Sequence, residues 1–135
     1  MRTIEDLLET PYHIIDILPE RVKENAPGQY FAIERYWLTE PQRTEIKRRH
    51  ADLILKLNCY CAVSPDDEAE TNPAPERIAE TILQRYVCIR TGDALITSAP
   101  DETYLTVYNA DEALLKLLET LCRSEGLYLW QPEQE

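Results

Sequence analysis

The chain has 135 residues, 44% of them hydrophobic and 29% charged, which is typical of one folded domain and excludes a disordered chain. The net charge is −11. Residues 61–135 carry five Lys or Arg against fifteen Asp or Glu, so no nucleic acid is expected to bind there. No apolar run reaches membrane-spanning length, and the amino-terminal segment does not resemble a signal peptide. We therefore expect a cytoplasmic protein with reduced thiols that binds no membrane.

The first part of the chain predicts short elements separated by prolines and charged residues. Aromatic residues without an internal breaker favour a strand at 29–38. The predicted elements are a helix over residues 3–9, a strand over 12–18, a loop over 19–28 and a strand over 29–38.

A helix start is predicted at Thr39, because Gln42 can reach back to its backbone and Pro41 falls in the first turn. This helix is expected to run to about Ala51. Residues 53–63 alternate apolar and polar six times in succession, which favours a strand. Some of the same apolar residues would also suit a continuing helix, so that alternative remains open.

The second part of the chain begins with an acidic, proline-rich loop at about 64–75. Thr91-Gly92-Asp93 fits a hairpin turn. Asn109, with Glu112 three residues later, predicts the start of a helix with a strong apolar stripe that ends at Gly126. The predicted elements are a helix over 76–85, strands over 86–90, 94–97 and 103–108, a helix over 109–125 and a strand over 127–130.

Interleaved helices and alternating strands, with at least one hairpin, favour an α+β fold. We expect a two-layer sandwich, in which helices pack on one face of a mostly antiparallel sheet. Neither part of the chain can bury a core alone, so residues 1–135 are expected to form a single domain.

Four phrases resemble a family of small uncharacterised proteins from gut-type Firmicutes. They are PYHIIDILP (11–19), LKLNCY (55–60), LTVYNADEALLKLL (105–118) and EGLYLWQP (125–132). The resemblance implies a bacterial, cytoplasmic protein. It carries no activity and no catalytic residue onto this chain.

The aromatic residues of the last two predicted strands form the main candidate site. Alternation places Tyr104 and Tyr108 on one face of their strand, and Tyr128 and Trp130 on one face of theirs. If helices cover the other face, the four rings share an open sheet face suited to a protein interface. The competing interpretation is a second layer of core.

A second candidate is a basic patch on one helix, formed by Arg43, Lys47, Arg48, Arg49 and His50. It could bind an acidic partner or a phosphate, although a solvated helix face is the simpler interpretation. Because the patch complements the acidic part of the chain, head-to-tail self-association is a further option.

No catalytic, cofactor or metal site is predicted. Cys59 and Cys61 would share one strand face but lack the further ligands that zinc requires. His13 and Asp16 would face opposite sides of their strand. No phosphate-binding loop or hydrolase motif occurs in the sequence.

We therefore expect a non-enzymatic interaction or accessory domain that uses the aromatic face, with a protein partner or a homodimer. The first alternative is an acidic binding inhibitor of the immunity-protein or charge-mimic type. Its carboxylates would converge on one face: Asp67, Glu70, Asp101, Glu102, Asp111 and Glu112. The second alternative is a small enzyme whose site is assembled from scattered residues: His13, Asp16, His50 and Cys59.

Overall fold

The computed structural model of the chain describes residues 3–20, 22, 25–66 and 70–132. Within these ranges six strands form one sheet in the order β2-β3-β4-β5-β1-β6, and all neighbouring strands are antiparallel. The strands are β1 (Tyr12–Asp16), β2 (Ser64–Pro65), β3 (Val87–Thr91), β4 (Ala94–Ser98), β5 (Tyr104–Tyr108) and β6 (Tyr128–Trp130). The helices are α1 (Ile4–Leu8), α2 (Tyr30–Leu38), α3 (Gln42–Asn58), α4 (Pro75–Gln84) and α5 (Glu112–Ser124). None of the described helices is long and apolar enough to cross a membrane.

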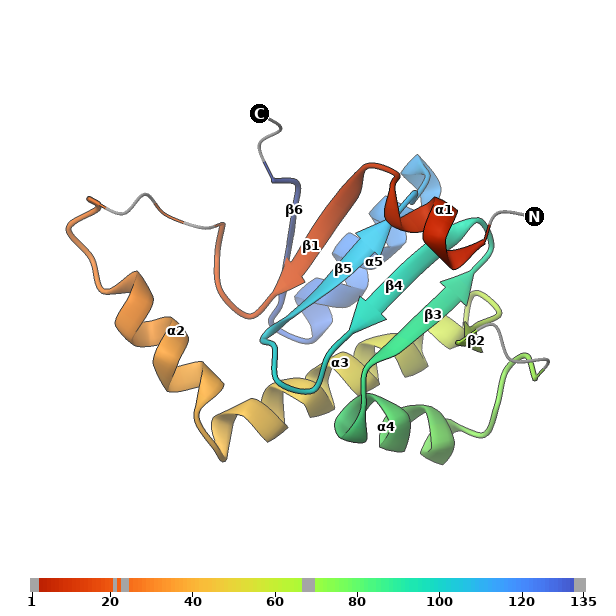
Figure 1. Ribbon diagram of the computed structural model, residues 1–135, viewed down its shortest axis with the longest axis horizontal. Helices are drawn as coiled ribbons and strands as arrows, with labels where there is room; N and C mark the ends of the chain where they lie inside the picture. The colour runs from red at the N-terminus through yellow and green to blue at the C-terminus, as the bar shows by residue number, and fades with distance from the viewer. Residues whose placement is uncertain (1–2, 21, 23–24, 67–69, 133–135) are drawn as a thin grey trace.

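Helices α3, α4 and α5 cover one face of the sheet and form the main core with it (Figure 1). The core contains wholly buried aliphatic side chains from both layers: Ile15, Ile89, Ile96, Leu105 and Val107 from the sheet, and Leu53, Ile54, Leu57, Ile78, Ile82 and Leu118 from the helices. Each contributes about 1.5–3 kcal/mol to folding by leaving water. The predicted α+β sandwich, with a mostly antiparallel sheet and its main helices on one face, is confirmed.

The short helix α1 lies on the opposite face of the sheet. Its N-cap Thr3 accepts a hydrogen bond from the backbone of Asp6 and donates its own backbone N–H to the Asp6 carboxylate, which forms a capping box. The helix then places Leu7 against Cys88 and Leu95 in a small second core. This helix therefore covers the β3 and β4 part of that face, and Tyr108 at the end of β5 packs against the same cluster.

The predicted strand over 29–38 is wrong, because residues 30–38 form helix α2. A strand needs a neighbouring strand for its backbone hydrogen bonds, and none of the described strands lies beside this segment. The helix satisfies them locally instead, and Ile33 N donates to the carbonyl of Gln29 at 2.9 Å. Aromatic residues are enriched in strands because they suit a half-buried pleated surface. Their presence alone therefore could not distinguish a strand from a helix in this segment.

The predicted strand over 53–63 is also wrong, because α3 continues to Asn58. Ile46, Leu53, Ile54 and Leu57 are buried along α3 at helical spacing, as the alternative interpretation required. The helix packs against both α4 and α5. Burial between two helices favours apolar residues at helical spacing over apolar residues that alternate with polar ones.

The predicted cap of α3 is not formed. Pro41 is the N-cap residue and makes no side-chain capping bond. Thr39 instead donates its hydroxyl to the carbonyl of Arg35, near the end of α2, at 2.8 Å.

The elements of the acidic part of the chain largely follow the prediction. Gly92, with φ of +56°, lies in the tight connection between β3 and β4. The N-cap of α5 is Asp111, whose carboxylate accepts from Leu114 N at 2.8 Å. Asn109, the predicted cap, instead adopts φ of +57° and donates its side-chain amide to the carbonyl of Asp93 at 2.9 Å. Gly126, with φ of +70°, follows the end of α5 as predicted.

The predicted loop at 64–75 begins with a short ordered strand. Ser64 and Pro65 form β2 and pair with Arg90 and Ile89 at the edge of the sheet. Part of the acidic cluster in this loop, residues 67–69, lies outside the described residues.

Candidate functional site

The antiparallel register divides the side chains of β1, β5 and β6 between two faces. Ile15 lies opposite Leu105 and Leu129, and all three pack into the main core. Because side chains alternate along a strand, the intervening residues project from the other face, where Figure 1 shows no helix in front of most of these strands. We call this surface the open face. It consists of Tyr12, Ile14, Asp16, Tyr104, Thr106, Tyr108, Tyr128 and Trp130.

The four aromatic residues singled out in the sequence lie together on the open face, and their binding role stays a prediction. Tyr128 is the most exposed of them, at 52% of its surface, and Tyr104, Tyr108 and Trp130 are half-buried. The sequence analysis missed Tyr12, which is 42% exposed and packs against Tyr108 with tilted rings at a centroid distance of 5.6 Å. Its position two residues before Ile14 in the same alternating strand is the signal that would have found it.

Asp16 is a carboxylate within this aromatic surface. It lies opposite Tyr104 on β5 and Tyr128 on β6, and only 6% of it is exposed. Its side chain accepts a hydrogen bond from Leu18 N at 3.1 Å. Burial raises the pKa of Asp16 to about 6, and the negative charge of Glu34 on α2 adds to this effect. The open face can therefore gain a negative charge as the pH rises through this range.

Helix α2 is a second apolar surface, which projects away from the sheet (Figure 1). None of its residues is buried. Large apolar side chains on it are exposed over roughly two fifths to one half of their surfaces: Phe31 46%, Ile33 45%, Tyr36 53% and Leu38 37%. In the described part of the chain, its main packing contact is with α3, across the short connection between the two helices.

The basic residues predicted as a patch on α3 do not share a surface. Lys47 and His50 point into the protein and are 2% and 0% exposed. Arg43 and Arg49 form ion pairs within the helical segment, at 3.4 Å and 3.8 Å, with glutamates three and four residues before them. Arg48 is exposed. The spacing placed all five on one helix but could not show that the helix turns part of this set toward the sheet.

The two buried members of that set form a polar cluster beneath the sheet. Lys47 Nζ donates to Ser98 Oγ at 2.9 Å. Burial lowers the pKa of Lys47 to about 8, against the opposing influence of the carboxylates of Glu102 and Asp101. Burial, and then the positive charge of Lys47, hold the pKa of His50 well below its usual value.

An easily deprotonated lysine beside a serine hydroxyl can activate a nucleophile in principle. Here Ser98 is 1% exposed, and neither Lys47 nor Ser98 lines the pocket found among the described residues. Both side chains are therefore closed off from the surface in this structure.

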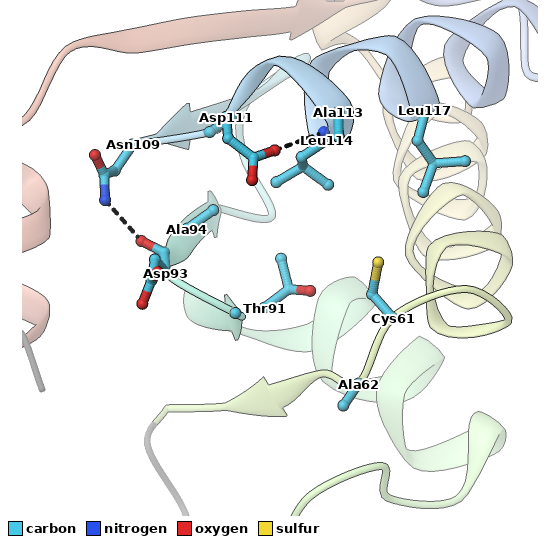
Figure 2. Close-up of a pocket in the computed structure, with 12 residues that line it drawn as sticks. Cys61, Ala62, Thr91, Asp93, Ala94, Asn109, Asp111, Ala113, Leu114 and Leu117 are labelled. Atoms are coloured by element: carbon cyan, nitrogen blue, oxygen red, sulfur yellow. Dashed lines mark hydrogen bonds between the residues drawn. The ribbon is translucent and has the colours of Figure 1, made fainter.

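The pocket lies at the other end of the sheet and has a volume of about 710 Å³. Figure 2 shows it between the β3–β4 turn, the start of α5 and the segment after α3. Leu114 and Leu117 contribute apolar surface. The polar groups of Asn109 and Asp111 are already engaged with the protein backbone. Among the described residues, no hydrogen bond joins two titratable side chains of this pocket.

The scattered residues considered for an enzyme are not assembled into one site. His13 faces the helix side of β1 and Asp16 the open side, and His50 is buried on α3. Cys59 is exposed at the end of α3 and does not share a strand face with Cys61, because this segment is not a strand. In the described ranges, no three His, Cys, Asp or Glu side chains are grouped closely enough to hold a metal ion.

Four of the carboxylates considered for a charge mimic lie at opposite ends of β5. Asp101 and Glu102 precede β5, whereas Asp111 and Glu112 follow it. Five residues of strand separate the two pairs by roughly 17 Å. Asp67 lies outside the described residues.

Comparison with protein-family models, with curated proteins and with solved structures finds no match to this chain.

Proposed function

We propose that this protein is a non-enzymatic interaction or accessory domain that binds a protein partner through the open face, in the cytoplasm. The observation that carries the proposal is the strand register, which gathers five aromatic side chains on a face of β1, β5 and β6 that the described helices leave largely uncovered. Contiguous exposed apolar surface of this kind marks interaction sites in proteins.

The chemistry of the open face suits protein recognition. Tyrosine and tryptophan bury large rigid surfaces at low entropic cost and retain a polar group for hydrogen bonding, so they dominate binding energy at interfaces. Tyr104 and Tyr128 flank Asp16 across three neighbouring strands. A partner would therefore meet aromatic anchors around a carboxylate, which favours a complementary apolar segment that carries a basic side chain.

The test is affinity capture from native cells with quantification of every captured protein. The test variant is Tyr104→Ser/Tyr128→Ser, and the matched control is Tyr60→Ser, which removes a tyrosine that is 69% exposed outside the open face. We expect the double variant to lose a specific companion that the wild type and the control retain. If all three proteins retrieve the same companions in the same amounts, the open face is not the binding surface.

A further inference from the structure

We infer that the partner is a second copy of this chain, and that α2 of each copy packs on the open face of the other in a closed twofold dimer. This inference rests on the proposed function of the open face and names its occupant. It is carried by two uncovered apolar surfaces on one chain, α2 and the open face.

Helix α2 requires a covering surface. An isolated helix of fewer than about 12 residues is marginal in water, and packing of an apolar face normally stabilises it. Seven of the nine α2 residues are apolar or aromatic, yet none is buried. A helix that is apolar around most of its circumference is ordinarily buried in an assembly.

The area of the two surfaces matches what a dimer needs. With about 200 Å² for each large side chain, the exposed fractions of Phe31, Ile33, Tyr36 and Leu38 amount to about 350 Å². On the open face, the exposed fractions of Tyr12 and Tyr128 add about 190 Å² by the same reasoning. In a twofold exchange each copy buries both surfaces, so the total reaches about 1,100 Å², which clears the roughly 1,000 Å² expected of a specific interface.

The charges of the two surfaces allow this pairing. Helix α2 carries one acidic residue, Glu34, and one basic residue, Arg35, so it is neutral although the whole chain is strongly acidic. Arg35 on α2 is exposed and forms no ion pair with any described residue. Burial raises the pKa of Tyr104, and the negative charge of Glu102, which precedes β5, adds to this effect. Glu102 therefore borders the open face, where Asp16 is a second carboxylate. Helix α2, which carries Arg35, therefore suits the acidic, aromatic open face of another copy.

The arrangement of the two surfaces favours a closed dimer. In Figure 1, α2 and the uncovered strands β1 and β6 lie in the same half of the molecule, whereas the β3–β4 turn that borders the pocket lies at the far end. If α2 instead entered that pocket in another copy by a head-to-tail contact, the assembly would be a ring or an open chain rather than a dimer. Reciprocal packing on the open face covers α2 of both copies.

The experiment measures molar mass by sedimentation equilibrium and light scattering from micromolar to submillimolar concentration. We expect a reversible dimer with no larger species. Ile33→Glu on α2 and Tyr128→Ser on the open face should each weaken the dimer by at least about tenfold, and Tyr60→Glu should not. Because no residue of α2 is buried in the single chain, Ile33→Glu should leave the circular dichroism spectrum and melting curve of the monomer unchanged.

Charge exchange tests the pairing directly. Arg35→Glu and Glu102→Arg should each weaken the dimer, and the double variant should restore it. Hydrogen exchange of the α2 amides should slow as the dimer forms, while exchange in α5 stays unchanged.

Three results would overturn the inference: a monomer throughout, a dimer indifferent to Ile33→Glu, or open-ended oligomers. A monomer that still loses a companion in Tyr104→Ser/Tyr128→Ser would overturn the inference alone and leave the proposed function standing. If no open-face variant weakens the dimer, and Tyr104→Ser/Tyr128→Ser captures the same companions as the wild type, both the inference and the proposed function are overturned.

Discussion

The buried lysine of α3 gives a prediction whose magnitude can be worked from the structure. Lys47 is 2% exposed, and burial lowers its pKa from 10.5 to about 8. At about 1.4 kcal/mol per pKa unit, keeping this side chain charged in the folded state costs about 3 kcal/mol at neutral pH. The Lys47→Met variant removes the charge and keeps a similar volume. It also loses the hydrogen bond to Ser98, which contributes about 1.5–3 kcal/mol.

We therefore expect Lys47→Met to be as stable as the wild type at pH 7, or more stable by about 1–2 kcal/mol. The pH dependence of the difference in unfolding free energy is a sharper test of the burial of Lys47. Between pH 8 and 10.5 the unfolded state holds a proton on Lys47 that the folded state has lost, so raising the pH stabilises the wild type relative to the variant. The difference in unfolding free energy should change by about 3 kcal/mol across this window in favour of the wild type.

Urea denaturation at pH 7, 8, 9 and 10.5, followed by circular dichroism, measures this difference directly. Lys116→Met, at an exposed lysine of α5, is the matched control and should change stability by less than about 0.5 kcal/mol. If the difference between the wild type and Lys47→Met stays constant from pH 8 to 10.5, the burial argument for Lys47 is refuted.

Three further predictions concern stability. Asp16→Asn keeps the acceptor for Leu18 N and removes a carboxyl whose pKa is raised from 3.8 to about 6. The wild type should therefore lose stability relative to this variant as the pH rises from 3.8 to 6, which denaturation at several pH values measures; a difference that ignores pH would contradict it. Ile82→Ala should cost about 2–5 kcal/mol in urea denaturation because Ile82 is wholly buried, and a cost below about 1 kcal/mol would mean that the core is misplaced. Gly126→Ala should lower stability by about 1–2 kcal/mol, since φ is +70° and the added carbon would lie 3.2 Å from Nη1 of Arg49; an unchanged melting temperature would argue against this conformation.

The sequence alone predicted the structure correctly where the local sequence signal and the tertiary environment favoured the same secondary structure. Thr91-Gly92-Asp93 indicated a tight hairpin because Gly adopts the positive φ that the turn requires. The apolar stripe of α5 was readable because its spacing fits only a helix. The alternation within β5 and β6 was enough to place Tyr104 with Tyr108, and Tyr128 with Trp130, on one face of each strand.

The sequence was insufficient where a segment has two acceptable local structures. Residues 53–63 fit both periods, and the position of α3 against α4 and α5 selected the helix. Residues 30–38 are aromatic enough for a strand but have no described strand beside them, so their backbone forms a helix.

What the sequence determined by itself was therefore the fold class, the hairpin, the apolar stripe of α5 and the pairing of aromatic rings on one face within β5 and within β6. Only the tertiary structure decided which face the helices cover, that Lys47 and His50 turn inward, and that α2 is left without a buried residue. Backbone preferences act over a few residues, whereas burial depends on which distant segments come to lie against each other.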